Sequence, residues 1–390
     1  MVGSTPVRLL LPLLAALVAV APAAPAAAEL PPAAAGASFG AAPLGLGTPG
    51  PFRQLFLDPP LSDARAVGTP SLSARLESAN SWSVPALFGR GGRVVAVQND
   101  VEADALVLSV RLPWTLLAPG GFRERLTTTL GWRATAFWGG FEDGGIEAWH
   151  GLVGAYNFQR QLYPRDHIHL RLLEPGGPRA LDLESGRFSA GDLVLATQAL
   201  LASGGRAEAR GSPPEAPAWG ISARLDLKLP TGSLAQAGGS GGFDAGVALL
   251  GSFELTRWAV LHGMLFGTAT SALASSVALQ PRTFHAGVDL SLAVLLGPVT
   301  LLAEDRYLSA LMEGGWTSLD GGSDDAYISS AYAALFRPHN QVSFGLRWRE
   351  LTLSFSEDFT PGSNPRGARS WFYNENAPDT VLALTFTLPL

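Results

Sequence analysis

Cysteine is absent from the 390 residues, which excludes disulfides and thiolate metal or redox sites. Charged residues make up 15% of the chain, against about 25% in soluble proteins, so a typical cytosolic enzyme is disfavoured. Beyond the N-terminus no continuous apolar run predicts a membrane helix: 259–279 contains His262 and glycines, and Pro298 breaks the run over 288–302. The net charge of −6 argues against the basic surface of a nucleic-acid-binding protein.

The first 28 residues have the three parts of a secretory signal peptide. Arg8 precedes an apolar run over 9–20, and small residues ending at Ala28 provide the cleavage site. A retained anchor is the alternative, although Pro12 interrupts the run. We therefore predict a signal peptide over 1–28. Residues 29–68 begin with a stretch rich in Ala, Pro and Gly, and we predict a flexible periplasmic N-terminal stretch there.

From residue 69 onward the apolar residues recur with a period of two. Four segments show the pattern most clearly, over 125–138, 219–229, 342–349 and 381–388, and nine noisier segments resemble them. Strands of about 9 to 11 residues with one apolar face suit a bilayer crossing. We predict an all-β fold, a transmembrane antiparallel up-and-down β-barrel over 69–390. Bacterial barrels close with an even number of strands, so the thirteen segments predict 12 strands, with 14 as the alternative.

A soluble β-sandwich also alternates, but its outer face would carry more Lys, Glu and Asp. Tryptophans near the predicted strand ends favour aromatic girdles at the membrane interfaces. The phase of the pattern places a set of apolar side chains toward lipid: Leu130, Trp132, Ile221, Leu225, Phe344 and Phe386.

One segment departs from the period of two. Within a predicted long loop over 139–187, acidic residues precede apolar residues at helical spacing, which predicts a short amphipathic helix acting as a plug or lid. Its residues are Glu142, Asp143, Ile146, Glu147, Trp149 and Val153. We expect the helix to fold against the barrel mouth or into the lumen, where its carboxylates would pair with Arg125 or Arg133. The alternative is a helix on the membrane surface.

Four short segments resemble an uncharacterised proteobacterial outer-membrane family, domain of unknown function 3187. The segments are Gly-Gly-Phe-Glu-Asp-Gly-Gly-Ile-Glu-Ala-Trp-His over 139–150, Leu-Lys-Leu-Pro-Thr-Gly-Ser over 227–233, Ser-Gly-Gly-Phe-Asp over 240–244 and Ser-Phe-Ser-Glu-Asp over 354–358. The resemblance implies an outer-membrane barrel across most of the mature chain. It supplies no activity.

Two clusters of polar residues invite a chemical interpretation. His167 and His169 could share a metal with a nearby carboxylate, but the sequence offers no convincing third ligand. His285, Asp289 and Ser291 share one strand face, yet His285 and Asp289 would lie about 13 Å apart, too far for a catalytic triad. We predict no catalytic residue, no metal and no cofactor.

The polar strand faces predict a basic lumen, with eight basic side chains against four acidic ones. The lumen-facing candidates are Arg111, Arg125, Arg133, Arg224, Asp226, Lys228, His285, Asp289, Glu304, Arg306, Arg347 and Arg349, and the fourth acid is Asp358. These charges would either face a solute or pair with one another across the lumen.

These features predict a channel or transporter-like protein for a small solute, in the outer membrane of a Gram-negative bacterium after signal-peptide cleavage. The basic lumen favours an anionic solute. The alternatives are a non-transporting structural or interaction barrel with a lumen filled by side chains, and an outer-membrane hydrolase or lipid-modifying enzyme. The expected partners are outer-membrane lipid, the barrel-assembly machinery and the small anionic solute, with no nucleic acid.

Overall fold

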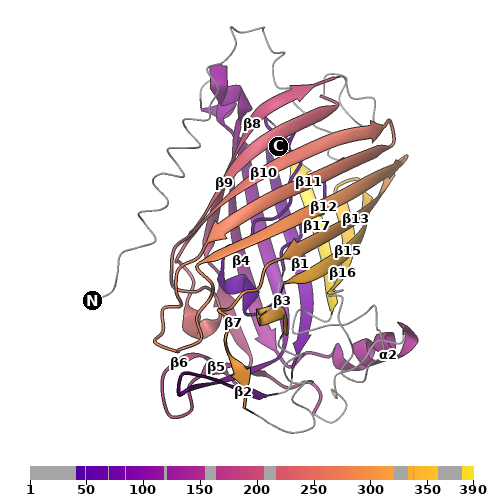
Figure 1. Cartoon of the computed structure of the whole chain (residues 1–390). Coiled ribbons are helices and arrows are strands. Elements are labelled where there is room, and N and C mark those ends of the chain that lie inside the picture. The colour runs from indigo at the N-terminus through magenta and orange to yellow at the C-terminus, as the bar shows by residue number, and fades with distance from the viewer. Residues whose placement is uncertain are drawn as a thin grey trace. The chain divides into compact units, whose positions relative to one another are not determined.

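Alternating apolar and polar residues form long antiparallel strands that close on themselves (Figure 1). In the computed structural model, the described residues are 41–48, 50–68, 70–83, 85–117, 121–153, 164–205, 217–319, 333–336, 338–358 and 380–390. All of them belong to one of the chain's two compact units, 34–390. The predicted signal peptide and residues 29–40 lie outside the described residues.

Within these ranges twelve strands form the barrel wall, which confirms the predicted fold and strand number. In wall order they are β1 (Ser71–Trp82), β3 (Arg93–Pro113), β4 (Leu126–Trp138), β8 (Leu193–Gly204), β9 (Trp219–Leu229), β10 (Asp244–Thr256), β11 (Ala259–Ala269), β12 (Phe284–Leu296), β13 (Val299–Leu308), β15 (His339–Trp348), β16 (Leu351–Asp358) and β17 (Thr380–Pro389). Strand β17 pairs with β1 from Pro389↔Ser71 onward and closes the barrel. The thirteenth candidate segment, 325–337, is not a wall strand, because its described residues include the short helix α4 (Ala333–Phe336).

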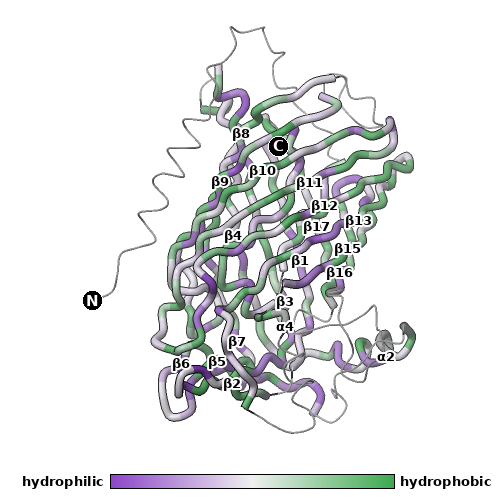
Figure 2. The backbone as a smooth tube through the Cα atoms, viewed as in Figure 1, coloured by the Kyte–Doolittle hydropathy of each residue, from purple (hydrophilic) through white to green (hydrophobic). Residues whose placement is uncertain are grey.

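The wall exposes apolar side chains on its outer surface. Leu130, Phe344 and Phe386 are exposed, while β9 alternates between half-buried apolar residues and buried polar ones along its whole length. Figure 2 shows this alternation of hydropathy along the strands. Further exposed apolar residues occur all around the wall: Leu72, Leu76, Leu249, Phe253, Leu265, Leu290, Leu301, Leu346, Leu353, Leu382, Leu384 and Leu388.

The two ends of the barrel differ in their connections. At the turn end, where β17 finishes, three connections are two-residue turns, at 257–258, 297–298 and 349–350, and two are longer, 114–125 and 205–218. At the opposite, loop end, the connections 139–192, 230–243, 270–283 and 309–338 are long. This end carries β2 (Ala86–Arg90), α2 (Asp143–Val153), β5 (His169–Leu173), β6 (Arg179–Leu183), β7 (Arg187–Ala190), the 3-10 turn η6 (Leu234–Gln236) and β14 (Thr317–Ser318) (Figure 1).

A hydrophobic core lies beneath these connections and is separate from the apolar outer surface of the wall. It joins β2, β5 and β6 to the protruding first part of β3, through residues such as Phe88, Val95, Leu172 and Leu181. Strand β14 extends this small sheet by pairing with β2. Among the described residues no helix is long and apolar enough to cross a membrane.

Candidate functional site

Residues 41–48 and 50–68 lie inside the barrel, and we call them the lumenal segment. The sequence predicted a flexible stretch here, and the structure corrects that prediction for these residues. They contact opposite sides of the wall, with hydrogen bonds to β8, β11 and β15. Small and proline residues fit the narrow lumen, and polar side chains of the wall satisfy the backbone groups of the segment.

The lumenal segment runs from the turn end to the loop end and back. Its tip is the 3-10 turn η2 (Arg53–Leu55), where the Leu55 carbonyl accepts a hydrogen bond from the backbone N–H of Ser240 at 3.0 Å. Ser240 belongs to the loop-end connection 230–243. After the return, the Gly68 N–H donates to Thr127 Oγ1 at 3.2 Å, at the start of β4. The segment therefore spans the lumen twice.

The two arms of the segment, 41–48 and 57–68, touch at Gly45. This glycine has φ of 60°, and an added Cβ would lie 2.8 Å from the Leu61 carbonyl oxygen. A larger residue here would require the left-handed backbone region and would push the arms apart. Glycine at this position therefore allows both arms to share one lumen.

Four wall arginines hold the segment by donating to its backbone carbonyls, and Arg75 on β1 donates to Gly45 O at 3.0 Å. Arg347 on β15 donates to Ala42 O at 2.7 Å. Arg306 on β13 donates to Leu46 O at 2.8 Å and to Pro59 O at 3.0 Å. Arg224 on β9 donates to Pro60 O at 2.7 Å. Proline has no N–H to donate but keeps its carbonyl, so a proline-containing segment matches an arginine-rich wall.

Acceptors on the same part of the wall bind the N–H groups of the segment. Glu304 accepts from Gly45 N and Leu46 N, and Asp244 accepts from Leu57 N at 2.9 Å. Buried His262 donates through Nε2 to Ala41 O at 2.7 Å. Both backbone donors and backbone acceptors of the segment thus have wall partners.

Two aspartates in the segment are buried as ion pairs. Asp58 pairs with Arg306, and Asp63 forms a bidentate pair with Arg65 at 2.8 and 3.0 Å. Burial favours the neutral carboxyl, but Arg306 and Arg53 hold the pKa of Asp58 below its usual value. Burial acts in the same way on Asp63, and Arg65 with His262 still keeps its pKa below the usual range. Both carboxylates are ionised at neutral pH.

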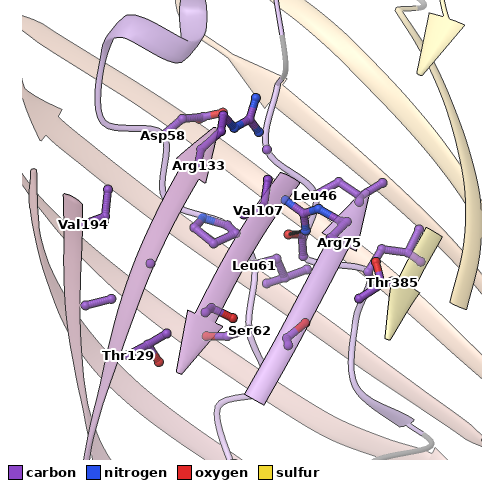
Figure 3. A pocket seen from close by; sticks show the side chains of 18 of the residues that line it. Leu46, Asp58, Leu61, Ser62, Arg75, Val107, Thr129, Arg133, Val194 and Thr385 are labelled. Carbon is purple, nitrogen blue, oxygen red and sulfur yellow. Dashed lines mark hydrogen bonds between the residues drawn. The ribbon is translucent and has the colours of Figure 1, made fainter. Parts of the chain in front are cut away.

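The segment leaves a cavity of about 600 Å³ along the other side of the lumen. Strands β15, β16, β17, β1, β3, β4, β8 and β9 line it on the wall side, and the lumenal segment lines it on the inner side. Figure 3 shows Leu46, Leu61 and Ser62 from the segment and Arg75, Val107 and Thr129 from the wall. The volume falls in the range of small-molecule sites, about 300–1,000 Å³.

Strand register arranges the wall side of the cavity in three rows. Nearest the turn end, Ser71, Arg111 and Thr129 lie side by side on β1, β3 and β4. The next row consists of Thr387, Ser73, Ser109 and Gly131. The third row consists of Thr385, Arg75, Val107 and Arg133. Each row lies two residues, about 7 Å, from the next, so hydroxyl groups occupy most of the wall between two levels of arginine.

Most charged groups around the cavity are paired. Arg75 and Arg133 share Glu77, with distances of 2.6 and 2.7 Å. Lys228, the single lysine of the chain, binds Asp192 at 2.6 Å and lies 3.4 Å from Asp244. Arg111 lies on the cavity wall with no ion pair or hydrogen bond to any described residue.

The lumen-facing candidates fall into two groups. Arg111, Arg133, Arg224, Asp226, Lys228 and Arg347 line the cavity. His285, Asp289, Glu304 and Arg306 are buried on the side of the wall that the lumenal segment covers. Arg224 and Asp226 also pair with each other at 2.9 Å.

Two of the predicted lumen arginines lie elsewhere. Arg349 is in the two-residue turn between β15 and β16, with φ of 52°, and its guanidinium stacks on Trp348 at 5.2 Å. The prediction extended the alternating pattern of β15 one residue beyond the end of the strand. Arg349 belongs to a tight turn, which has no period-two pattern. Arg125 ends the 3-10 turn η4 (Gly121–Arg125), so it precedes β4 and is not on its lumen face.

The predicted amphipathic helix forms as α2 and contacts the loop-end mouth through Asn80, but its predicted pairing with the lumen arginines is wrong. Figure 1 shows it at the loop end, outside the barrel. Its acids bind other partners: Asp143 accepts from Asn80 and from the Asp166 backbone, and Glu147 pairs with Arg165. Arg133 pairs with Glu77 instead.

The remaining helix residues have mixed positions. Ile146 is buried and Glu142 donates its backbone N–H to Glu102. The side chains of Trp149 and Val153 lie outside the described residues. The lumen is occupied by the lumenal segment, so α2 is not its plug.

The two polar clusters of the sequence also have ordinary structural partners. His285 bonds the Ala310 carbonyl through Nδ1 at 3.2 Å, and Asp289 lies 3.5 Å from Arg306. The rings of His167 and His169 stack at 6.0 Å. Among the described residues no group of three His, Cys, Asp or Glu side chains could hold a metal ion.

Several site residues were missed in the sequence. Those with the largest role are Asp58, Asp63, Arg75, Glu77, Asp192 and Asp244. Arg75 and Glu77 share one phase of β1, so the period of two could have placed them in the lumen. Asp58 and Asp63 had no such signal, because the lumenal segment has no regular period.

No family model and no curated protein matches the chain. Solved outer-membrane proteins are similar to it at low sequence identity. One is an outer-membrane channel from Pseudomonas putida F1, with 12% identity, a TM-score of 0.43 and coverage of 83% of this chain and 96% of that chain. The NanC porin has 8% identity, a TM-score of 0.37 and coverage of 81% and 97%. The outer-membrane channel DcaP of Acinetobacter baumannii has 10% identity, a TM-score of 0.27 and coverage of 84% and 99%.

Proposed function

We propose that this protein is an outer-membrane channel for a small anionic solute, which passes through the cavity beside the lumenal segment. The observation that carries the proposal is the cavity itself. Along β4 its lining extends from Thr127 to Thr135, about 27 Å of strand, which is most of the length of that strand. A cavity of this length along the wall is better explained as a path for a solute than as a local packing defect.

The charge of the lining supports an anionic solute. Six basic and four acidic side chains border the cavity, so the bases exceed the acids by two. The bases are Arg75, Arg111, Arg133, Arg224, Lys228 and Arg347, and the acids are Asp58, Asp63, Asp192 and Asp226. A net positive lining concentrates anions and lowers their barrier to entry.

The apolar outer surface supports a location in a membrane. A soluble monomer rarely exposes a contiguous apolar patch larger than a few hundred Å², whereas leucine and phenylalanine side chains are exposed around this wall. We place the protein in the outer membrane of a Gram-negative bacterium, inserted by the barrel-assembly machinery after cleavage at Ala28. Assignment to the family of domain of unknown function 3187 is part of the same proposal.

A second candidate function is a non-transporting barrel, and the contacts of the lumenal segment favour it. Four wall arginines and two buried ion pairs hold the segment in place. A permanently filled lumen would make the barrel a rigid support for its loop-end core. Conductance separates the two candidates.

The proposed function is tested by recording single-channel currents of the full chain in planar bilayers. We expect a small conductance with reversal potentials that show anion selectivity. Deletion of residues 42–66 should raise the conductance several-fold, because the open lumen of a 12-strand barrel is wide enough for a channel. A silent full chain that becomes conducting only after the deletion would favour the non-transporting barrel.

A further inference from the structure

Arg111 differs from the other bases around the cavity. Arg75 and Arg133 share Glu77, Arg224 binds Asp226, and Lys228 binds Asp192. Arg347 donates to the backbone of the lumenal segment. Arg111 has no such contact among the described residues, although it lies on β3 inside a membrane-spanning wall. A guanidinium in this position is available to an anion from solution.

Hydroxyl groups surround Arg111 on the same face of the sheet. Ser71 and Thr129 lie directly opposite it on the two neighbouring strands. Ser73 and Ser109 pair with each other in the next row and also line the cavity. Serine and threonine hydroxyls both donate and accept, so they suit the hydroxyl groups of a ligand.

Other charged residues border the cavity near Arg111, on the lumenal segment and on the wall toward the loop end. Asp63 of the lumenal segment borders the same cavity, but the bidentate contact with Arg65 compensates its charge. On the loop-end side, the row of Arg75 and Arg133 lies four residues, about 14 Å, from Arg111. Their shared Glu77 offsets one of the two positive charges of that row, whereas Arg111 has no ion pair among the described residues.

We infer that Arg111, with Ser71, Ser109 and Thr129, forms a binding subsite for a small carboxylate that carries several hydroxyl groups. Arg111 would bind the carboxylate, for which the planar guanidinium fork is suited. The serine and threonine rows would bind the hydroxyl groups along the cavity. This inference rests on the proposed function and specifies its solute class as a hydroxy acid.

The test uses the full chain in detergent, with gluconate as the probe and glucose as its uncharged counterpart. Titration calorimetry should show gluconate binding and no glucose binding. Arg111→Gln should weaken gluconate binding about tenfold or more, the loss of one charge-assisted hydrogen-bonded contact. Arg111→Lys keeps the charge but loses the fork, so an intermediate loss is expected. Ser109→Ala should cause a smaller loss.

Arg257→Gln is the matched control, because Arg257 is exposed in the turn between β10 and β11. It should bind gluconate as the unmodified chain does. Heat-dependent gel migration of each variant checks that the barrel is folded, and Arg111→Lys carries the test if Arg111→Gln does not fold.

The outcomes separate the subsite from the channel. Anion-selective conductance without gluconate binding would overturn the subsite and leave the proposed function intact. Gluconate binding that survives both Arg111 substitutions would also overturn it. A full chain with no conductance overturns the proposed function, whatever it binds.

Discussion

The two halves of the barrel wall are built from the same kind of strand but present different inner faces. From β9 to β15 the inner face carries Arg224, His262, Glu304, Arg306 and Arg347, which are buried against the lumenal segment. From β16 through β1 to β8 the inner face carries mainly serine and threonine and borders the cavity. We call these the covered half and the open half.

The difference shows how side-chain length divides a lumen. Long bases and carboxylates of the covered half reach across to the backbone of the segment and hold it to one side. On the open half, Arg75 and Gln198 also bond the segment, but most inner-face side chains there are short serines and threonines, so a space remains. The outer faces of both halves are apolar alike, because both contact lipid in our proposal.

The largest effect should come from a charge removed on the covered half. Arg306→Met would leave Asp58, Asp289 and Glu304 with a buried excess of negative charge. Breaking such a buried pair typically costs about 3–5 kcal/mol. Arg111→Met on the open half removes no pair and should cost less than about 1 kcal/mol. Urea unfolding in detergent micelles measures both, and equal losses would contradict the division of the wall.

Lipid-facing substitutions should not distinguish the halves. Leu225→Arg on β9 and Leu130→Arg on β4 should each cost about 2–4 kcal/mol, because each places a charge among lipid tails near mid-membrane. Folding into lipid vesicles measures the loss. If Leu225→Arg is harmless while Arg224→Leu, at the neighbouring position, is severe, the assignment of the faces is reversed.

Acid should weaken the lumenal segment first. The pKa of Asp58 is lower in the folded state than its ordinary value of 3.8, so its contribution to stability is complete above about pH 5. It is lost as the pH falls below 3.8 and through the folded-state pKa, when the carboxyl becomes protonated. Melting temperatures from pH 7 to pH 3 should show this loss. Asp58→Asn should flatten the profile, and Glu184→Gln, an exposed control, should not.

The smallest effect should come from a hydroxyl of the open half. Thr387 Oγ1 donates to Ser73 Oγ at 3.2 Å, so Ser73→Ala removes one neutral hydrogen bond. We expect a loss of about 1 kcal/mol or less. The same unfolding assay measures it, with Ser222→Ala on the covered half as the comparison. Since Ser222 Oγ donates to the Ala64 carbonyl, that variant should lose more.

Period-two alternation predicted the wall because consecutive residues of each strand face opposite sides, the apolar outer side and the polar lumen. Residues 219–229 illustrate this, with apolar and polar positions in strict alternation. The lumenal segment has no such alternation. Its partners are wall side chains more than a hundred residues away, such as Arg306 and Arg347, and its Ala, Pro and Gly content is equally typical of a loose tether.

For α2 the sequence predicted the local structure but not the tertiary contacts. Its amphipathic pattern predicted the helix itself, since spacing along the chain determines which residues share a face. The same pattern could not predict what that face contacts. Glu147 pairs with Arg165 in its own loop, and Arg133 pairs with Glu77 on β1, because the fold determines which side chains meet.

Accessibility of single cysteines tests the division of the lumen most directly. The chain has no cysteine, so Ser109→Cys on the open half and Ser291→Cys on the covered half each introduce one thiol on an inner face. A small sulfonate-bearing thiol reagent is added while current is recorded. We predict that the Ser109→Cys variant is modified and loses current, whereas the Ser291→Cys variant is not modified. Modification of Ser291→Cys with no change at Ser109→Cys would contradict it.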